Sequence, residues 1–218
     1  MHAGTKQILK RGIVAVHGPV GRARLRRALA APPRPLRLEL GSNGRRAGWL
    51  VTNASWRARY YLDVTGAWPV APGSADLVFA DNMIEHVPLA SGRAMLQQAH
   101  AALRPGGTIR LATPDVEMAA RLYLGEDEEK AAAVMGMHRR LGRVAEHPVD
   151  LLRVPFTEFG HHAGYLYDEA SLGDELKRAG FHDVRRCATG ESTIPDLRNL
   201  ENRDDDESFV QLVLEADA

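Results

Sequence analysis

The chain has 218 residues, of which 44% are hydrophobic and 26% charged, as is typical of a globular domain with a substantial core. Its formal net charge is zero, so overall charge gives no reason to expect nucleic acid as a partner. The single cysteine, Cys187, excludes an intramolecular disulfide and fits a cytoplasmic protein. No stretch approaches 18 continuous apolar residues, and we therefore expect no transmembrane segment.

The N-terminal part is strongly basic. It holds nine Lys and Arg residues and no acid before Glu39. A cluster of prolines (Pro32, Pro33, Pro35) predicts a boundary between a basic arm over residues 1–34 and a domain over residues 35–218. The simplest interpretation of the arm is a solvated or packing helix over residues 21–31. Two alternatives remain, a lid or homodimer contact and a peripheral contact with an anionic membrane surface.

Strands and helices alternate along the rest of the chain. The apolar pattern predicts strands over residues 36–40, 49–51, 60–64, 76–80, 108–112, 184–187 and 208–215. Residues 36–40 and 208–215 alternate, and residues 76–80 form a nearly continuous apolar run suited to a buried parallel strand. Helical spacing predicts helices over residues 89–103 and 169–179 and two within residues 116–145. This order indicates an α/β fold with an open, mostly parallel sheet, in which ligands bind beyond the carboxyl ends of the strands.

Polar turns follow three of the predicted strands. A glycine-rich turn covers residues 39–44, an ionisable segment covers residues 81–87, and a short turn covers residues 113–115. Glycine lets the backbone approach a ligand closely, while ionisable residues at a strand end are typical of a pocket. The sequence therefore predicts one site at this edge of the sheet.

Together with the segment Leu-Arg-Pro-Gly-Gly at residues 103–107, these turns resemble the class I S-adenosylmethionine (SAM)-dependent methyltransferases, in particular the type 11 group. The resemblance covers residues 35–115, and residues 179–184 and 208–216 are also similar to the family's tail. It implies a Rossmann-like fold with a seven-stranded, mostly parallel sheet, an antiparallel last strand and helices on both faces.

The resemblance also implies the residues that hold SAM. They are Glu39, Gly41, Ser42, Asn43, Gly44, Asn53, Asp63, Val64, Asn82, Met83, Glu85 and His86. Two features depart from the family pattern. Asn53 stands where most members have an acid that binds the ribose hydroxyls. Only residues 42–48 separate the first two strands, too few for the usual crossover helix, so that helix must be shortened or rearranged.

A hydroxyl acceptor needs a base or a metal ion near neutral pH. The candidate catalytic residues are His161, His162, His86 and Asp115. Some relatives bind Mg²⁺ through Glu-x-x-Glu-His, and the resemblance makes Glu85 and His86 candidate Mg²⁺ ligands. Asn82 replaces the first glutamate of that motif, which weakens the site for a hard cation. Without a metal, Glu85 and His86 would contact only cofactor and solvent.

We interpret the chain as a SAM-dependent O-methyltransferase for a small molecule or oligosaccharide. A sugar acceptor is favoured by resemblance to enzymes of polysaccharide assembly, including mycobacterial O-methyltransferases of methylmannose polysaccharides; that resemblance rests on Gly48-Trp49 and residues 190–192. One alternative is a lipid-linked or natural-product acceptor. The other is a catalytically degenerate SAM-binding partner subunit.

Overall fold

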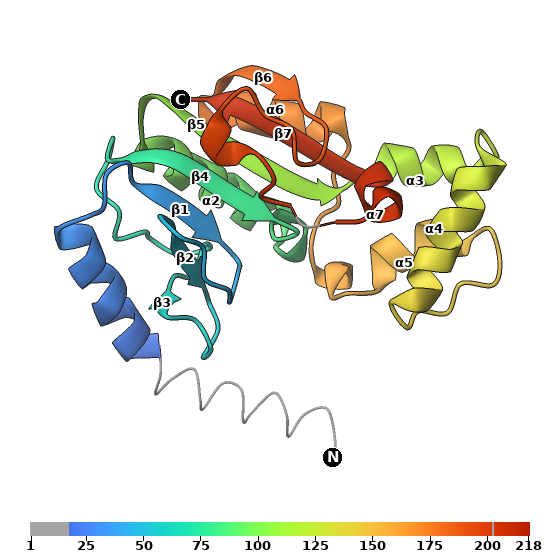
Figure 1. Ribbon diagram of the computed structural model, residues 1–218, viewed down its shortest axis with the longest axis horizontal. Coiled ribbons are helices and arrows are strands. Elements are labelled where there is room, and N and C mark those ends of the chain that lie inside the picture. Colours follow the sequence, from blue (N-terminus) through green and yellow to red (C-terminus); the bar gives the residue numbers. More distant parts are fainter. Residues whose placement is uncertain (1–17, 202) are drawn as a thin grey trace.

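The computed structural model describes residues 18–201 and 203–218, which build one mixed sheet of seven strands (Figure 1). The strand order is β3-β2-β1-β4-β5-β7-β6, and β7 runs antiparallel to both of its neighbours. The strands are β1 (Arg37–Leu40), β2 (Leu50–Asn53), β3 (Tyr60–Tyr61), β4 (Ala75–Asp81), β5 (Leu103–Pro114), β6 (His182–Arg186) and β7 (Gln211–Asp217). This order and direction confirm the expected Rossmann-like methyltransferase fold.

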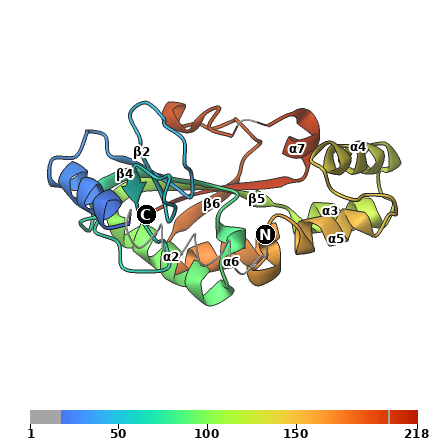
Figure 2. The ribbon, with the colours of Figure 1, turned by 90° about the horizontal axis from the view of Figure 1, so that it is seen from below.

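One face of the sheet is covered by helices. Alternate residues of the central strands, such as Leu38, Val78 and Ile109, are buried in the main core with residues of α2 (Leu89–Ala102) and α6 (Glu169–Ala179). Residues 18–30 are also helical, and Leu25 joins the same core. This part of the basic arm therefore packs on the domain. Figure 2 shows α2 and α6 together on one side of the sheet.

The opposite face is covered differently. The connections of residues 41–49 and 54–59 contain no helix, as the short spacing between the first strands predicts. Leu77 and Phe79 of β4 are instead buried under Leu197 and Leu200 of the C-terminal segment. Among the described residues, the helical element packed on this face is the short η3 (Pro195–Leu197). Helical residues thus lie on both faces, but very unequally.

A buried ionic cluster fastens the C-terminal segment to the sheet. Arg110 of β5 is fully buried and donates to Glu201 at 2.7 Å and 3.0 Å and to Glu215 of β7 at 2.7 Å. It also donates to the carbonyls of Ala188 and Glu191. Burial alone would raise the pKa of Glu201, but Arg110 overrides that effect and holds this pKa below its usual value. The cluster satisfies charges that would otherwise be costly to bury.

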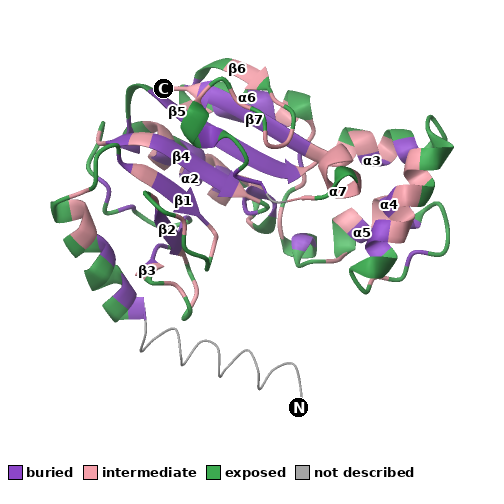
Figure 3. Cartoon of the chain, in the orientation of Figure 1, coloured by how far each residue is buried: buried purple, intermediate pink, exposed green. Residues whose placement is uncertain are grey.

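A small helical subdomain extends beyond the carboxyl ends of β4 and β5 (Figure 1). It comprises α3 (Val116–Tyr123), α4 (Glu128–Arg140), α5 (Asp150–Thr157) and the short α7 (Asp205–Phe209). Asp115, Asp127 and Asp204 cap the first, second and last of these helices by accepting backbone N–H groups. Leu122, Val134, Met137 and Leu151 form a core of its own, and Figure 3 marks buried stretches in purple on α3, α4 and α5.

Three strands differ clearly from the sequence prediction. The fifth runs over Leu103–Pro114 and not only over residues 108–112, and the third and the last also differ. The third strand is limited to Tyr60–Tyr61, because the chain turns away after Leu62, whose N–H still donates to Asn53 O. The last strand starts at Gln211 and not at residue 208, because the Asp204 cap draws residues 205–209 into α7. No helix among the described residues is long and apolar enough to span a membrane.

We predict that Arg110→Met lowers the free energy of unfolding by about 3–5 kcal/mol, since it leaves Glu201 buried without its cation. Arg104→Met is the matched control. Arg104 lies on the same strand, but its side chain is half exposed beside Asp76, and we expect a loss below about 1 kcal/mol. Urea unfolding of both variants measures the difference, and equal losses would show that the buried cluster is not the anchor.

Candidate active site

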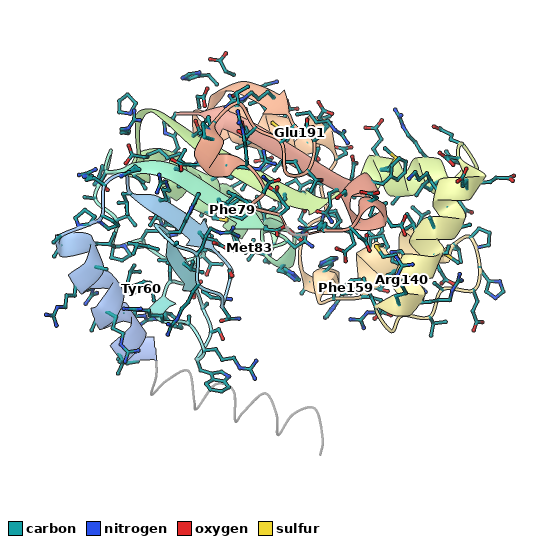
Figure 4. All side chains as sticks on the ribbon, viewed as in Figure 1. Tyr60, Phe79, Met83, Arg140, Phe159 and Glu191 are labelled. Atoms are coloured by element: carbon teal, nitrogen blue, oxygen red, sulfur yellow. The ribbon has the colours of Figure 1, made fainter. Side chains whose placement is uncertain are left out.

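A cavity of about 430 Å³ opens beyond the carboxyl ends of β4 and β5. The apolar walls come largely from the helical subdomain and include Leu122, Met137 and Phe159. Figure 4 labels Phe159. Its polar groups are fewer, and among them are His86, Asp115, His138 and His161. A mostly apolar pocket with a few convergent polar groups is typical of a small-molecule site.

Glu85 is the most deeply buried acid next to this cavity. It lies in η1 (Ile84–His86), directly after β4, and its side chain is 0% exposed. The Thr113 hydroxyl donates to its Oε2 at 3.1 Å, whereas its Oε1 has no hydrogen-bond partner. Burial raises the pKa of Glu85 to about 8. Glu85 is therefore mainly a neutral carboxylic acid at pH 7.

His161 faces Glu85 from η2 (His161–Ala163). Its ring is buried, and its Nδ1 lies 2.7 Å from Pro155 O, which can only accept, so we assign the proton to Nδ1. Its Nε2 then carries a lone pair and lies 3.9 Å from Glu85 Oε1. Burial holds the pKa of His161 below its usual value, so the ring is neutral at pH 7.

The loop that carries His161 closes directly on η1. A Cβ on Gly164 would lie 1.7 Å from Glu85 O, so only glycine fits there. The next residue, Tyr165, donates its N–H to the same carbonyl at 3.2 Å. This contact keeps the histidine loop and the acid of η1 at one fixed separation.

His86 completes a cluster with Glu85 and His161. Its ring lies edge-on to that of His161, with 4.8 Å between the centroids. Loss of solvent and the neighbouring His161 lower the pKa of His86. One donor atom from each of the three side chains lies within 4.8 Å of the others, an arrangement that could hold a metal ion. His162, by contrast, is exposed and does not line the cavity.

Asp115 lines the cavity, but both of its oxygens are occupied. Oδ1 accepts the N–H groups of Glu117 and Met118 at the start of α3, and Oδ2 accepts from Arg186 at 2.8 Å. These hydrogen bonds hold Asp115 in the wall of the cavity.

Most of the predicted cofactor residues meet at the turn after β1. Gly41 has φ +83°, and a Cβ there would lie 2.3 Å from Met83 Cγ. Asn53 ends β2 and donates its Nδ2 to Gly41 O at 2.7 Å, while Ser42 Oγ accepts from Gly44 N. Asn43 is exposed in the same turn.

Four other predicted cofactor residues lie apart from this turn. Glu39 pairs with Arg46 at 2.7 Å. Asp63 is exposed and accepts from Thr65, and Val64 is buried in the main core. Asn82 adopts φ +43° and lines the cavity, so it lies with His86 on the other side of Met83.

The structure adds two cavity residues that were not among the candidate catalytic residues. Arg203 lines the cavity and forms an ion pair with Asp81 at the end of β4. His138 is buried, its Nδ1 has no partner, and burial lowers its pKa to about 4. Arg203 comes from the acidic C-terminal segment and His138 from the last turn of α4, and neither position carries a local motif.

Comparison with known proteins gives a family and a fold. Residues 31–185 match the family described as a methyltransferase domain. No curated protein sequence matches the chain. A SAM-dependent methyltransferase from Archaeoglobus fulgidus shares the fold with a TM-score of 0.50 and 11% identity, over 90% of this chain and 92% of that one.

Two further solved structures are similar at lower TM-scores. A possible histamine N-methyltransferase from Thermotoga maritima has a TM-score of 0.48 and 15% identity, over 98% of this chain and 95% of that one. Phosphoethanolamine N-methyltransferase 2 of Haemonchus contortus with bound SAM has a TM-score of 0.44 and 18% identity, over 78% of this chain. The match spans only 38% of that longer chain. None of these three is described as acting on a sugar.

The buried acid predicts a pH-dependent stability. The folded protein keeps a proton on Glu85 that the unfolded chain releases above its ordinary pKa of 4.5. Stability therefore falls as the pH rises from about 5 towards 8, by on the order of 4 kcal/mol for this group. Glu85→Gln should remove this contribution, whereas the exposed control Glu117→Gln should not. Urea titrations at pH 5 and pH 8.5 measure it, and an unchanged pH slope in Glu85→Gln would contradict the assignment.

Proposed function

Because the chain belongs to the class I SAM-dependent methyltransferases, we propose that it transfers the methyl group of SAM to a hydroxyl of a small polar acceptor bound in the cavity. The proposed acceptor class is a sugar or an oligosaccharide. SAM supplies a methyl group already activated on a sulfonium, so the protein has to hold the partners in line and remove one proton.

The observation that carries this proposal is a set of unsatisfied polar atoms at a mostly apolar cavity. His138 Nδ1 and Gln211 Oε1 belong to residues that line the cavity. Both are buried without a partner in the protein, and leaving such atoms unpaired is costly. An acceptor with several hydroxyl groups would satisfy them, because each hydroxyl both donates and accepts.

His161 is the proposed general base. The Nδ1–H bond to Pro155 O orients the ring and leaves the Nε2 lone pair for the acceptor proton. As the new C–O bond forms and the S–CH₃ bond breaks, the hydroxyl proton passes to Nε2, and S-adenosylhomocysteine leaves. Glu85, neutral and 3.9 Å away, places no competing negative charge beside the attacking oxygen.

The turn after β1 is the proposed SAM-binding segment. Gly41 to Gly44 offer backbone groups, and the donation from Asn53 to Gly41 O holds the turn in place. With its Nδ2 used in this way, Asn53 keeps Oδ1 as the acceptor for a ribose hydroxyl. A neutral amide accepts more weakly than a carboxylate, so we expect weaker SAM binding than an acid at this position would give.

A metal-assisted reaction is the second candidate, and the cluster of Glu85, His86 and His161 favours it. The carbonyl of Pro155 orients His161 as second-sphere groups orient metal-bound histidines. Two imidazoles and one carboxylate suit Mn²⁺, Fe²⁺ or Zn²⁺ better than Mg²⁺, which prefers oxygen ligands. The donor set thus argues against the Mg²⁺ expected from the sequence. Any bound metal would act on the acceptor oxygen and need Glu85 ionised.

We expect His161→Gln to lower turnover by about 10²–10⁴-fold, the usual contribution of a general base, while the Kd for SAM stays unchanged. Glutamine can still donate to Pro155 O, which preserves the loop. His162→Gln, the adjacent exposed residue, is the control and should keep full activity. S-adenosylhomocysteine release with a panel of mannosides and other sugars measures turnover, and calorimetry measures SAM binding.

His161 must be unprotonated to act as the base, and its pKa lies below 6.5. The rate of the wild-type enzyme should therefore fall only at a pH below 6.5. Full activity of His161→Gln would rule out this base.

Chelation separates the two candidates. If His161 alone removes the proton, dialysis against EDTA leaves turnover unchanged. Loss of turnover that Mn²⁺ restores better than Mg²⁺ would replace the base mechanism with the metal-assisted one. Metal content measured by mass spectrometry in wild type and His86→Ala provides the readout independent of activity.

A further inference from the structure

A second cavity, of about 670 Å³, lies at the sheet edge beside β3. Five arginines line it, together with Trp56 and Tyr60. The arginines are Arg24, Arg27, Arg45, Arg57 and Arg59. The two cavities share no lining residue, and Figure 4 shows Tyr60 well apart from Phe159, so this basic pocket is separate from the proposed active site.

Three separate segments of the chain converge on the basic pocket. The helix over residues 18–30 contributes two arginines, the connection between β1 and β2 contributes Arg45, and the connection between β2 and β3 contributes the remaining two. These are the connections that lack helices. Their long side chains line one open space, and no acidic residue is among those that line it.

The charges of the pocket are not balanced within the protein. Across residues 18–201 and 203–218, no carboxylate lies within ion-pair distance of these five guanidinium groups, whereas the nearby Arg37 and Arg46 both have acidic partners. Residues 1–38 contain no acid at all, so the arm cannot neutralise them. Five permanent positive charges around one cavity repel one another, and a bound anion would relieve this repulsion.

The lining also indicates which anion fits. Guanidinium groups bind phosphate oxygens through paired, charge-assisted hydrogen bonds. Five of them exceed the charge of a single phosphate and match that of a diphosphate better. Arg57 lies 5.1 Å over the Trp56 ring and Arg59 lies 5.4 Å over the Tyr60 ring, which adds flat surfaces against which a base or a sugar can stack.

We propose that the basic pocket binds the diphosphate group of a small molecule, such as a nucleoside diphosphate or a lipid diphosphate headgroup. Its volume lies in the range of small-ligand sites, and a concave shape suits a discrete ligand better than a flat membrane. The proposal concerns a site outside the methyl-transfer cavity and holds whether or not the acceptor is a sugar.

Two double variants test the proposal on one helix. Arg24→Ala/Arg27→Ala removes two guanidinium groups from the pocket. Arg22→Ala/Arg26→Ala removes the same net charge from the other side of the helix, where those residues line a cavity with Asp63. Titration with inorganic pyrophosphate and with UDP at constant ionic strength should show at least ~10-fold weaker binding in the first variant and little change in the second.

The source of the diphosphate follows from the same titrations. Equal affinity for pyrophosphate and UDP would assign recognition to the diphosphate alone, and tighter binding of UDP would add stacking of the base. Phosphatidylcholine vesicles containing farnesyl diphosphate, compared with phosphatidylcholine–phosphatidylglycerol vesicles, test the lipid carrier.

Several outcomes would overturn the proposal. They are no binding of pyrophosphate or UDP to the wild type, equal losses in both variants, and binding of phosphatidylglycerol vesicles or of an RNA oligonucleotide that pyrophosphate does not displace. Thermal unfolding of each variant shows that the fold is kept. A SAM titration, read separately, distinguishes failure of this proposal from failure of the methyltransferase assignment.

Discussion

The buried cluster around Arg110 is the constraint on which the second face of the sheet depends. No long helix packs there in the described chain, and the hydrophobic cover from Leu197 and Leu200 is small. Arg110 compensates because it binds two acids and two carbonyls that belong to separate parts of the C-terminal region. Once Glu201 is held in this way, Arg203 two residues later can reach Asp81 at the rim of the cavity. The same anchor that closes the core therefore also shapes the site.

A second close contact gives the site its chemistry. Because Gly164 has no side chain, the histidine loop packs directly on the backbone of Glu85 and shuts its carboxyl off from water. That exclusion raises the pKa of the acid and lowers that of His161, so both groups are neutral together at pH 7. A neutral pair is cheaper to bury than an ion pair with imperfect geometry, and it leaves the Nε2 lone pair available.

Periodicity and strand-end motifs predicted the sheet, the helices over residues 89–103 and 169–179 and the edge at which the site lies. They succeeded because the alternation of Leu36, Leu38 and Leu40 along the first strand is a local pattern that packing in the main core reinforces. Long-range pairing could not be read in the same way. Glu39 lies in the glycine turn's sequence yet faces Arg46, and Asp115 is occupied by a cap and by Arg186 from β6. Whether an acid is free to bind a ligand depends on partners elsewhere in the chain, which lie 7 positions from Glu39 and 71 positions from Asp115.

The turn after β1 is not followed by the usual helix, so other contacts have to hold its backbone in place. In a full βαβ unit the N-terminus of that helix supplies oriented N–H groups and fixes the turn. Here the connection over residues 41–49 has no helix, and two side-chain contacts replace it: Asn53 bonds to Gly41 O, and Met83 packs against Gly41. An aspartate at position 53 could not donate to that carbonyl. The Asn53 amide therefore stabilises the turn through a hydrogen bond that an acid at this position could not make.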